Sequence, residues 1–128
     1  MTEEKILIVE DDPMNMELFR DLLVVLGYSI YEATDAREAL EQASENKFDL
    51  ILMDIQLPGM DGLTATKIIK KESENKDTPI VALTAYAMKG DKERIEGAGC
   101  DGYITKPINT KKFAETVATF LKYGLRDG

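Results

Sequence analysis

The sequence predicts an α/β fold in which a parallel sheet carries helices on both faces. Short apolar runs alternate five times with helical patterns along the 128 residues, which is typical of parallel strands joined by right-handed crossovers. One run, residues 50–53, is unbroken and enters a turn directly after Asp54, as expected of a strand buried on both faces. The length fits one domain with a sizeable core. We therefore expect a single domain over residues 1–128, with its core in residues 5–122.

The first elements are marked by composition and by helix signals. Residues 5–9 are a β-branched apolar run that predicts a strand, and the carboxylates of residues 10–12 follow it. Pro13 favours the start of a helix and Gly27 its end, with a second strand over residues 28–33. The apolar positions that keep helical spacing in this segment are Phe19, Leu22, Leu23 and Leu26.

The middle of the chain predicts two helices around the strand at residues 49–53. Asp35 and Glu38 have the spacing of a capping box. The helix that follows would bury Ala36, Ala39, Leu40 and Ala43. Asp61 is an expected N-cap for a helix that continues to residue 70, and the polar residues 73–78 are expected to form a loop.

The last third completes the alternation. Residues 79–83 predict a fourth strand that ends at Thr84, and a weak helical pattern lies near residues 91–96. Residues 102–105 predict a fifth strand, and residues 123–128 a frayed tail. Asn109 is the expected N-cap of a final helix that buries Phe113, Val117, Phe120 and Leu121. This succession fits a doubly wound, flavodoxin-like sheet of strand order 2-1-3-4-5 with five helices.

Composition excludes several classes of function. The chain has no histidine, which rules out a Ser-His-Asp triad and a histidine-ligated zinc site. Its one cysteine, Cys100, cannot form an internal disulfide and agrees with a reducing cytoplasm, where we expect the protein to act. The net charge of −8 disfavours binding to nucleic acid. No apolar run approaches the length of a membrane span, and the first residues do not form a signal peptide.

Chemically active side chains follow four of the predicted strands. Glu10 and Asp11 follow the first strand, Asp54 the third, Thr84 the fourth and Lys106 the fifth. The carboxyl ends of parallel strands lie along one edge of a sheet, so these groups are expected to converge. Crowded carboxylates raise one another's pKa unless a cation lies between them. Mg²⁺ satisfies such a set with oxygen ligands.

This set is suited to phosphoryl transfer onto a carboxylate. Asp54 would be the nucleophile, and Asp11 and Glu10 would hold the metal. Thr84 and Lys106 would then contact the phosphoryl oxygens.

Each of these residues also has a purely structural interpretation. Asp54 could end a strand, Asp11 and Asp12 could cap the first helix, Thr84 could bond its own loop, and Lys106 could be a solvated surface charge. These separate explanations would have to coincide at four strand ends on one edge. The functional interpretation is therefore favoured.

The residues resemble the receiver domain of two-component response regulators over about residues 5–122. The similarity rests on the acidic pair Glu10-Asp11, the segment Met53-Asp54-Ile55-Gln56-Leu57-Pro58-Gly59-Met60-Asp61-Gly62, Thr84-Ala85, and Lys106-Pro107. Within that family the chain looks most like the single-domain, DivK-like regulators. The features shared with them are Val9-Glu10-Asp11, Asn15-Met16 and Ala82-Leu83-Thr84-Ala85-Tyr86-Ala87.

The resemblance implies a signalling switch that catalyses only its own phosphorylation and autodephosphorylation. Asp54 would be phosphorylated by a histidine kinase or a phosphotransfer protein. Mg²⁺ would be held by Asp11, Asp54 and the backbone carbonyl of Gln56, with Glu10 acting largely through water. Thr84 and Lys106 would close on the phosphoryl oxygens, and the Lys106-Pro107 peptide would be cis.

The resemblance also implies how the signal leaves the domain. Tyr103 matches the aromatic switch residue, which turns inward when Thr84 moves. The face formed by the fourth helix, fifth strand and fifth helix would contact a downstream protein.

Three positions depart from the usual pattern of the family. Glu10 replaces the more frequent Asp, Asp12 adds a third carboxylate, and Tyr86 is bulky. We expect Tyr86 to hinder the water that hydrolyses the acyl phosphate.

Other classes of protein fit the sequence less well. A carboxylate-nucleophile phosphatase would want a second acid two positions after its nucleophile, where this chain has Gln56. A nucleotide-binding sheet would want a glycine-rich loop after the first strand, where this chain has carboxylates. A receiver-shaped adaptor that ignores phosphate would not need Asp54, Thr84 and Lys106 together.

Overall fold

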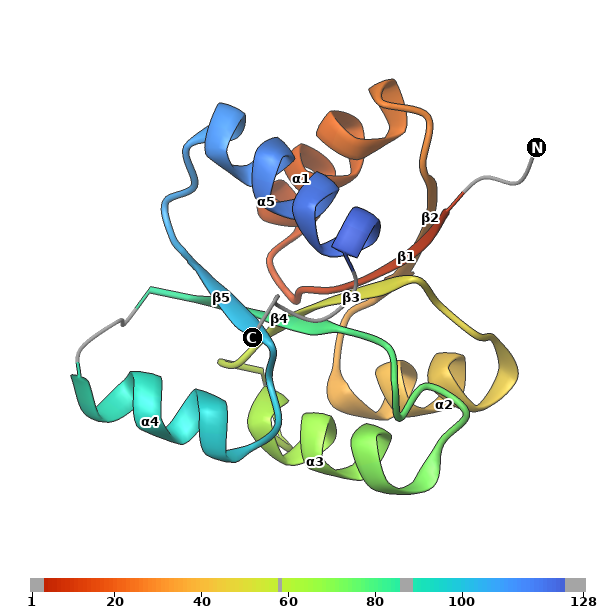
Figure 1. The fold of residues 1–128 in the computed structure, drawn as a ribbon, viewed down its shortest axis with the longest axis vertical. Coiled ribbons are helices and arrows are strands. Elements are labelled where there is room, and N and C mark those ends of the chain that lie inside the picture. The colour runs from red at the N-terminus through yellow and green to blue at the C-terminus, as the bar shows by residue number, and fades with distance from the viewer. Residues whose placement is uncertain (1–3, 58, 86–88, 124–128) are drawn as a thin grey trace.

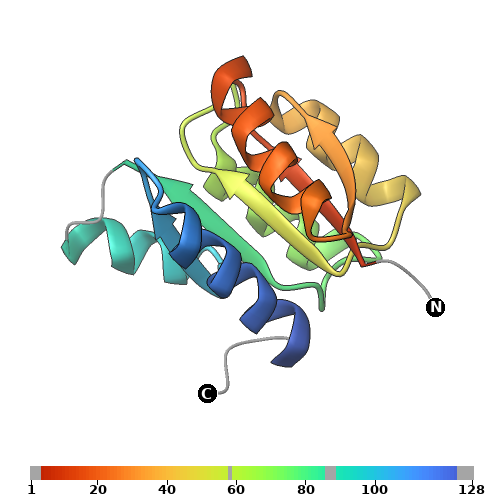
Figure 2. The same ribbon diagram turned by 90° about the horizontal axis from the view of Figure 1, so that it is seen from above.

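The computed structural model describes residues 4–57, 59–85 and 89–123, and these residues form a central parallel sheet between two layers of helices (Figures 1 and 2). The strands are β1 (Lys5–Val9), β2 (Ser29–Ala33), β3 (Leu50–Asp54), β4 (Ile80–Thr84) and β5 (Gly102–Thr105). The helices are α1 (Pro13–Val25), α2 (Ala36–Glu45), α3 (Gly62–Glu72), α4 (Lys89–Gly97) and α5 (Thr110–Tyr123). The predicted fold class is confirmed.

The strand order is β2-β1-β3-β4-β5, with every neighbouring pair parallel. In the three central strands nearly every residue is buried, since helices cover both faces of a parallel sheet. Helices α1 and α5 lie on one face, and α2, α3 and α4 on the other (Figure 1). The unbroken apolar runs in the sequence follow from this double coverage.

Alternate residues of each central strand enter two separate hydrophobic clusters, because successive side chains of a strand point to opposite faces. On the face of α1 and α5, Ile8 and Leu52 pack with Phe19 and Phe113. The two phenylalanine rings stack with their centroids 5.2 Å apart. On the opposite face Met53 packs with residues of α2, α3 and α4. The sheet is thereby held rigidly from both sides.

Polar side chains fix the starts of the helices. Asp12, Asp35 and Asp61 are the N-caps of α1, α2 and α3, and the Oδ1 atom of Asn109 accepts the amide of Lys112 at 2.9 Å. Each cap satisfies an amide that has no partner within its helix. The N-caps predicted at residues 35, 61 and 109 are confirmed.

Two expectations about helices change in detail. Helix α1 ends at Val25, so Leu26, which the helical pattern included, is the C-cap residue and is 52% exposed. The α2 capping box is shifted by one residue, because Glu38 accepts the amide of Thr34 instead of that of Asp35.

The loop expected at residues 73–78 contains a buried polar network. The Asn75 side chain is fully buried, donates to the carbonyls of Ala43 and Asn46, and accepts the amide of Phe48. The Thr78 hydroxyl bridges Asn75 Oδ1 and the carbonyl of Phe48. The network joins the segment before β3 to the segment before β4. It therefore fixes the amino ends of two central strands, at the edge opposite the strand-end carboxylates.

The chain ends fall partly outside the described residues. Tyr123, with which the tail was predicted to begin, still belongs to α5; residues 124–128, the rest of the predicted tail, lie outside the described ranges, as do Pro58 and Tyr86. In the part of the chain that the structure describes, no helix is long and apolar enough to cross a membrane.

Candidate phosphoacceptor site

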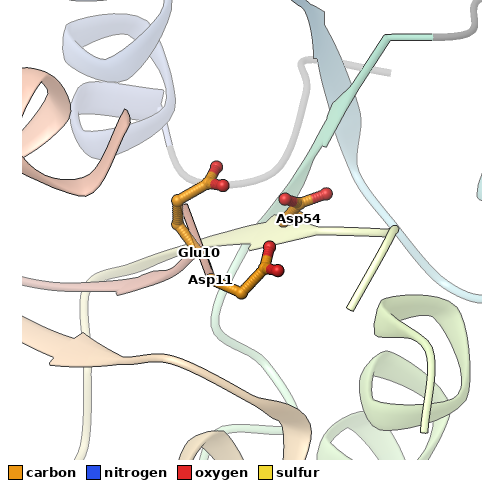
Figure 3. Close-up of side chains that lie close together, drawn as sticks. All are labelled: Glu10, Asp11 and Asp54. Carbon is orange, nitrogen blue, oxygen red and sulfur yellow. The ribbon is translucent and has the colours of Figure 1, made fainter. Parts of the chain in front are cut away.

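The carboxyl ends of the central strands bring three carboxylates together. Glu10 and Asp11 follow β1, and Asp54 is the last residue of the adjacent strand β3. One carboxylate oxygen from each of the three lies within 4.8 Å of the others, and Figure 3 shows the three side chains grouped beyond the strand ends. Glu10 and Asp54 are buried and Asp11 is exposed. The cluster thus opens to solvent on the side of Asp11.

The ammonium group of Lys106 lies between the two buried carboxylates. Its Nζ atom is 2.9 Å from Glu10 Oε1 and donates a hydrogen bond to Asp54 Oδ2, also at 2.9 Å. Lys106 reaches this position because its backbone amide donates to the carbonyl of Thr84 at 2.7 Å, just beyond β5. The Lys106-Pro107 peptide is cis, as expected.

The electrostatics of the site are dominated by burial and by this ion pair. Burial raises the pKa of Glu10, and Lys106 only partly offsets that rise. Burial alone would lower the pKa of Lys106, but the Glu10 and Asp54 carboxylates outweigh it and raise that pKa. The ammonium therefore stays charged and compensates the two carboxylates.

One oxygen in the site has an incomplete set of partners. Glu10 Oε2 accepts the amide of Asp12 at 3.2 Å. Glu10 Oε1 is a buried oxygen with no hydrogen-bond donor among the described residues, although the ammonium of Lys106 lies 2.9 Å away as an ion pair. Because a carboxylate oxygen can accept from more than one partner, Oε1 is also available to a cation or to a water bound to one.

In the loop after Asp54, a backbone amide donates a hydrogen bond to the Asp54 carboxylate. The amide of Gln56 donates to Asp54 Oδ1 at 2.9 Å, and the Gln56 side chain is exposed. Gly59 has a φ of 75°, a conformation that glycine adopts without strain. The turn signals after β3 therefore correspond to a loop that holds Asp54.

Thr84 and Tyr103 lie beside the cluster on the neighbouring strands. Thr84 is the last residue of β4 and is fully buried, and Asp54 pairs in register with the preceding residue, Leu83. Tyr103 on β5 is half-buried against the hydrophobic cluster on the α4 side. The Nζ atom of Lys92 on α4 is 5.6 Å from the centre of the Tyr103 ring, within the range of a cation–π contact.

Asp12 follows Asp11 directly, but its side chain does not join the cluster of Glu10, Asp11 and Asp54. Its side chain turns back to accept the amide of Met14 at 3.0 Å and caps α1. The helix-capping alternative considered from the sequence is therefore correct for Asp12. The N-cap position before Pro13 was the signal for it.

The structure brings Glu10, Asp11 and Asp54 together as the sequence predicted, whereas the packing around them was not predicted. Sequence reasoning did not find the ion pair between Lys106 and Glu10, because it depends on how far two side chains reach across the sheet. It also missed Gly62, which contacts the backbone of Asp54.

The sequence matches the response regulator receiver domain over residues 6–118. The chain belongs to this family. Receiver domains are phosphoacceptor switches that bind Mg²⁺ at an acidic pocket and partner with histidine kinases or phosphotransfer proteins and with effectors. A similar curated protein is the polar-differentiation response regulator DivK of Brucella anthropi. It is 48% identical over 118 residues, which span 92% of this chain and 96% of that protein.

Solved structures agree with this assignment. The receiver domain of the sensor histidine kinase PA1611 from Pseudomonas aeruginosa is 34% identical, with a TM-score of 0.86 over 94% of this chain and 99% of that one. That structure has a magnesium ion coordinated in its active-site cleft. The chemotaxis protein CheY4 of Vibrio cholerae is 30% identical, with a TM-score of 0.88 over 92% of this chain and 98% of that one.

Proposed function

We propose that this chain is a single-domain response regulator, spanning residues 1–128, whose Asp54 accepts a phosphoryl group from a phosphohistidine. The donor is a histidine kinase or a histidine phosphotransfer protein. The observation that carries the proposal is the set of charges around Asp54. Two further carboxylates lie within 4.8 Å of it and one ammonium lies 2.9 Å from its Oδ2 atom. This set combines a nucleophile, ligands for a hard cation and a cation for the phosphoryl oxygens.

The residues present fit Mg²⁺. The donor set consists of hard oxygen atoms, and the buried Oε1 of Glu10 lacks a hydrogen-bond donor among the described residues. Asp11, Asp54 and the backbone carbonyl of Gln56 would hold the ion, with Glu10 acting largely through water. When bound, the ion supplies positive charge that offsets the negative charge of Asp54 and of the incoming phosphoryl oxygens.

The transfer itself is carried out by Asp54. One carboxylate oxygen forms a bond to phosphorus as the phosphorus–nitrogen bond of the donor breaks. The bonding electrons go to the imidazole nitrogen, which then takes a proton from water. Lys106 gives up its contact with Asp54 Oδ2 and pairs with a phosphoryl oxygen. The hydroxyl of Thr84, at the end of the adjacent strand, approaches another.

The output of the switch follows from Thr84 and Tyr103. When Thr84 moves toward the phosphoryl group, the space it leaves allows the half-buried Tyr103 ring to turn inward. This turn changes the face formed by α4, β5 and α5, which contacts a downstream protein effector. The phosphoryl group shifts the equilibrium only because Thr84 contacts it in one of the two states.

In this proposal the protein acts in the cytoplasm and signals through protein contacts, without nucleic acid or membrane as partner. It transfers phosphoryl groups only onto and off its own Asp54. The phosphatase alternative is weaker because the position of its second acid holds Gln56, an exposed amide.

Intact mass spectrometry after incubation with phosphoramidate and Mg²⁺ tests the proposal. We expect a mass gain of one phosphoryl group that disappears when the metal is chelated beforehand. Asp54→Asn should show no gain. A wild-type protein that gains no mass, although it is folded and binds Mg²⁺, would contradict the proposal.

A further inference from the structure

The start of α3 lies in direct contact with the backbone of Asp54. Gly62 is the first residue of α3 and is buried. A Cβ atom on Gly62 would lie 2.1 Å from the carbonyl oxygen of Asp54 and 2.8 Å from the Cα atom of Ile55. Both of these are backbone atoms, which cannot turn aside as a side chain can. The absence of a side chain at Gly62 therefore sets how closely α3 approaches the end of β3.

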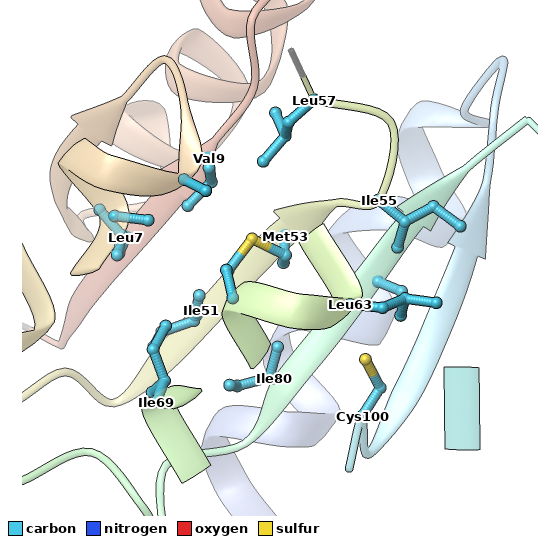
Figure 4. Packing of buried hydrophobic residues seen from close by; sticks show 14 of the residues in the cluster. Leu7, Val9, Ile51, Met53, Ile55, Leu57, Leu63, Ile69, Ile80 and Cys100 are labelled. Atoms are coloured by element: carbon cyan, nitrogen blue, oxygen red, sulfur yellow. The ribbon is translucent and has the colours of Figure 1, made fainter. Parts of the chain in front are cut away.

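One hydrogen bond joins this helix start to Ile55, and another holds the first turn of the helix together. The amide of Gly62 donates to the carbonyl of Ile55 at 3.3 Å, and the buried hydroxyl of Thr66 donates to the carbonyl of Gly62 at 2.9 Å. Leu63 and Ile55 belong to the same hydrophobic cluster (Figure 4). Helix α3 thus packs against the chain at Asp54 and Ile55, through its close backbone approach at Gly62 and through the side chain of Leu63.

We propose that Gly62 is a positioning residue for the Asp54 carboxylate. The first turn of α3 fixes the orientation of the Asp54–Ile55 peptide, and this peptide directs the carboxylate toward Lys106 and the metal ligands. The proposal rests on the proposed function of Asp54 as phosphoacceptor. It adds the requirement that position 62 has no side chain, although Gly62 contacts neither the metal nor the phosphoryl group.

Two other glycines are matched controls. At Gly97, the last residue of α4, a Cβ atom would meet nothing within 4 Å. At Gly102 on β5 a Cβ atom would lie 2.6 Å from the Cζ atom of Phe120, a side chain of α5. Gly97→Ala therefore reports the effect of the substitution alone. Gly102→Ala reports the effect of crowding at a half-buried glycine that does not contact Asp54.

The amide of Gln56 is a local reporter, because it donates to Asp54 Oδ1 at 2.9 Å. In Gly62→Ala we expect its hydrogen exchange to accelerate by about tenfold and phosphorylation by phosphoramidate to slow by about tenfold or more. The two control variants should keep the wild-type exchange at Gln56 and stay within about twofold of the wild-type rate. If Gly62→Ala matches Gly102→Ala in both measurements, α3 has simply moved outward and the proposal is wrong.

A second pair of variants tests the same idea without adding an atom. Asp61 and Asp35 each accept a helix N-terminal amide at 2.8 Å, on α3 and α2 respectively. We expect Asp61→Ala to accelerate exchange at Gln56 by about threefold or more while Asp35→Ala leaves it unchanged. Equal behaviour of the two variants would overturn the proposal even if Gly62→Ala failed to fold.

The readouts also separate this proposal from the proposed function. If the wild-type protein took up no phosphoryl group, the function of Asp54 would be wrong. Exchange at Gln56 would still decide whether Gly62 and Asp61 position the Asp54 carboxylate.

Discussion

At the scale of single residues, the ammonium of Lys106 allows two buried carboxylates to lie side by side. Glu10 and Asp54 are almost completely buried, and each has one oxygen 2.9 Å from Lys106 Nζ. Removing one member of a buried charged group leaves the others uncompensated. Lys106 therefore competes with any divalent cation for the same oxygens.

Lys106→Met should accordingly have opposite effects on metal binding and on phosphorylation. Loss of a positive charge a few ångströms from the carboxylates should tighten Mg²⁺ binding by about fivefold or more. Loss of the ammonium that pairs with the phosphoryl oxygens should slow phosphorylation by about tenfold or more. Calorimetric titration with Mg²⁺ and intact mass measure the two effects, with Lys112→Met on α5 as the control. Weaker Mg²⁺ binding in Lys106→Met would contradict the arrangement of charges.

Cys100 provides a test of packing away from the site. Its thiol is 8% exposed, and burial raises its pKa to about 11. At pH of about 7 and below the thiol is protonated in both folded and unfolded chains and has no effect on the pH dependence, because the pKa of an unfolded thiol is about 8.5. Between about pH 9 and 11 the unfolded chain loses the proton first, so stability falls as the pH rises.

We therefore expect the wild type to lose about 1 kcal/mol relative to Cys100→Ala between pH 8 and pH 10. Urea unfolding of both proteins at the two pH values measures this difference. Alkylation of the folded wild type by iodoacetamide at pH 8 should also be much slower than in urea. A pH-independent difference between the two proteins would show that the thiol is not buried as described.

At the scale of elements, the segment after β1 gives neighbouring carboxylates different tasks. Asp12 caps α1, whereas Asp11 contributes an oxygen to the cluster with Glu10 and Asp54. Asp12→Asn retains a capping oxygen, and we expect it to keep both stability and Mg²⁺ affinity near the wild-type values. Asp12→Ala should lower the free energy of unfolding by about 1 kcal/mol, without weakening Mg²⁺ binding by more than about twofold.

Asp11→Asn completes this set, because it removes the charge of a carboxylate that is proposed to hold the metal. It should weaken Mg²⁺ binding by about tenfold while stability stays close to that of the wild type. Urea unfolding and calorimetric titration separate the two behaviours. If Asp12→Asn weakened Mg²⁺ binding as much as Asp11→Asn, Asp12 would be part of the metal site.

The loops at the opposite edge of the sheet depend on one buried amide. Asn75→Ala removes three hydrogen bonds to backbone groups, those of Ala43, Asn46 and Phe48. Because these groups would lose their partner in the interior, we expect a loss of about 3 kcal/mol in urea unfolding. The exposed neighbour Lys76, replaced by Ala, should change stability by less than about 0.5 kcal/mol. A loss of similar size in both variants would argue against the network.

At the scale of the whole molecule, the strand order of the sheet brings the residues of the site together. Glu10, Asp54 and Lys106 are far apart in the sequence, but β1, β3, β4 and β5 are parallel neighbours whose carboxyl ends lie at one edge. The fold and the carboxylates were predictable for this reason, since both follow from the alternation of strands and helices.

Other features depend on tertiary distances and were not predictable from the sequence. From the sequence, Asn75 could be placed only in a polar loop and Gly62 only after a turn. Whether Lys106 reaches Glu10, and whether a Cβ at Gly62 would meet Asp54, is decided by how α3 and β5 pack against β3.

In the proposed function Asp54, and none of the carboxylates beside it, receives the phosphoryl group. Borohydride reduces an acyl phosphate and converts a phosphorylated aspartate to homoserine, so peptide mass spectrometry after phosphoramidate treatment locates the group. We expect homoserine at position 54 and unchanged residues at positions 10, 11 and 12. Reduction at Asp11 or Asp12, or a phosphorylated protein in which position 54 is still aspartate, would contradict the account.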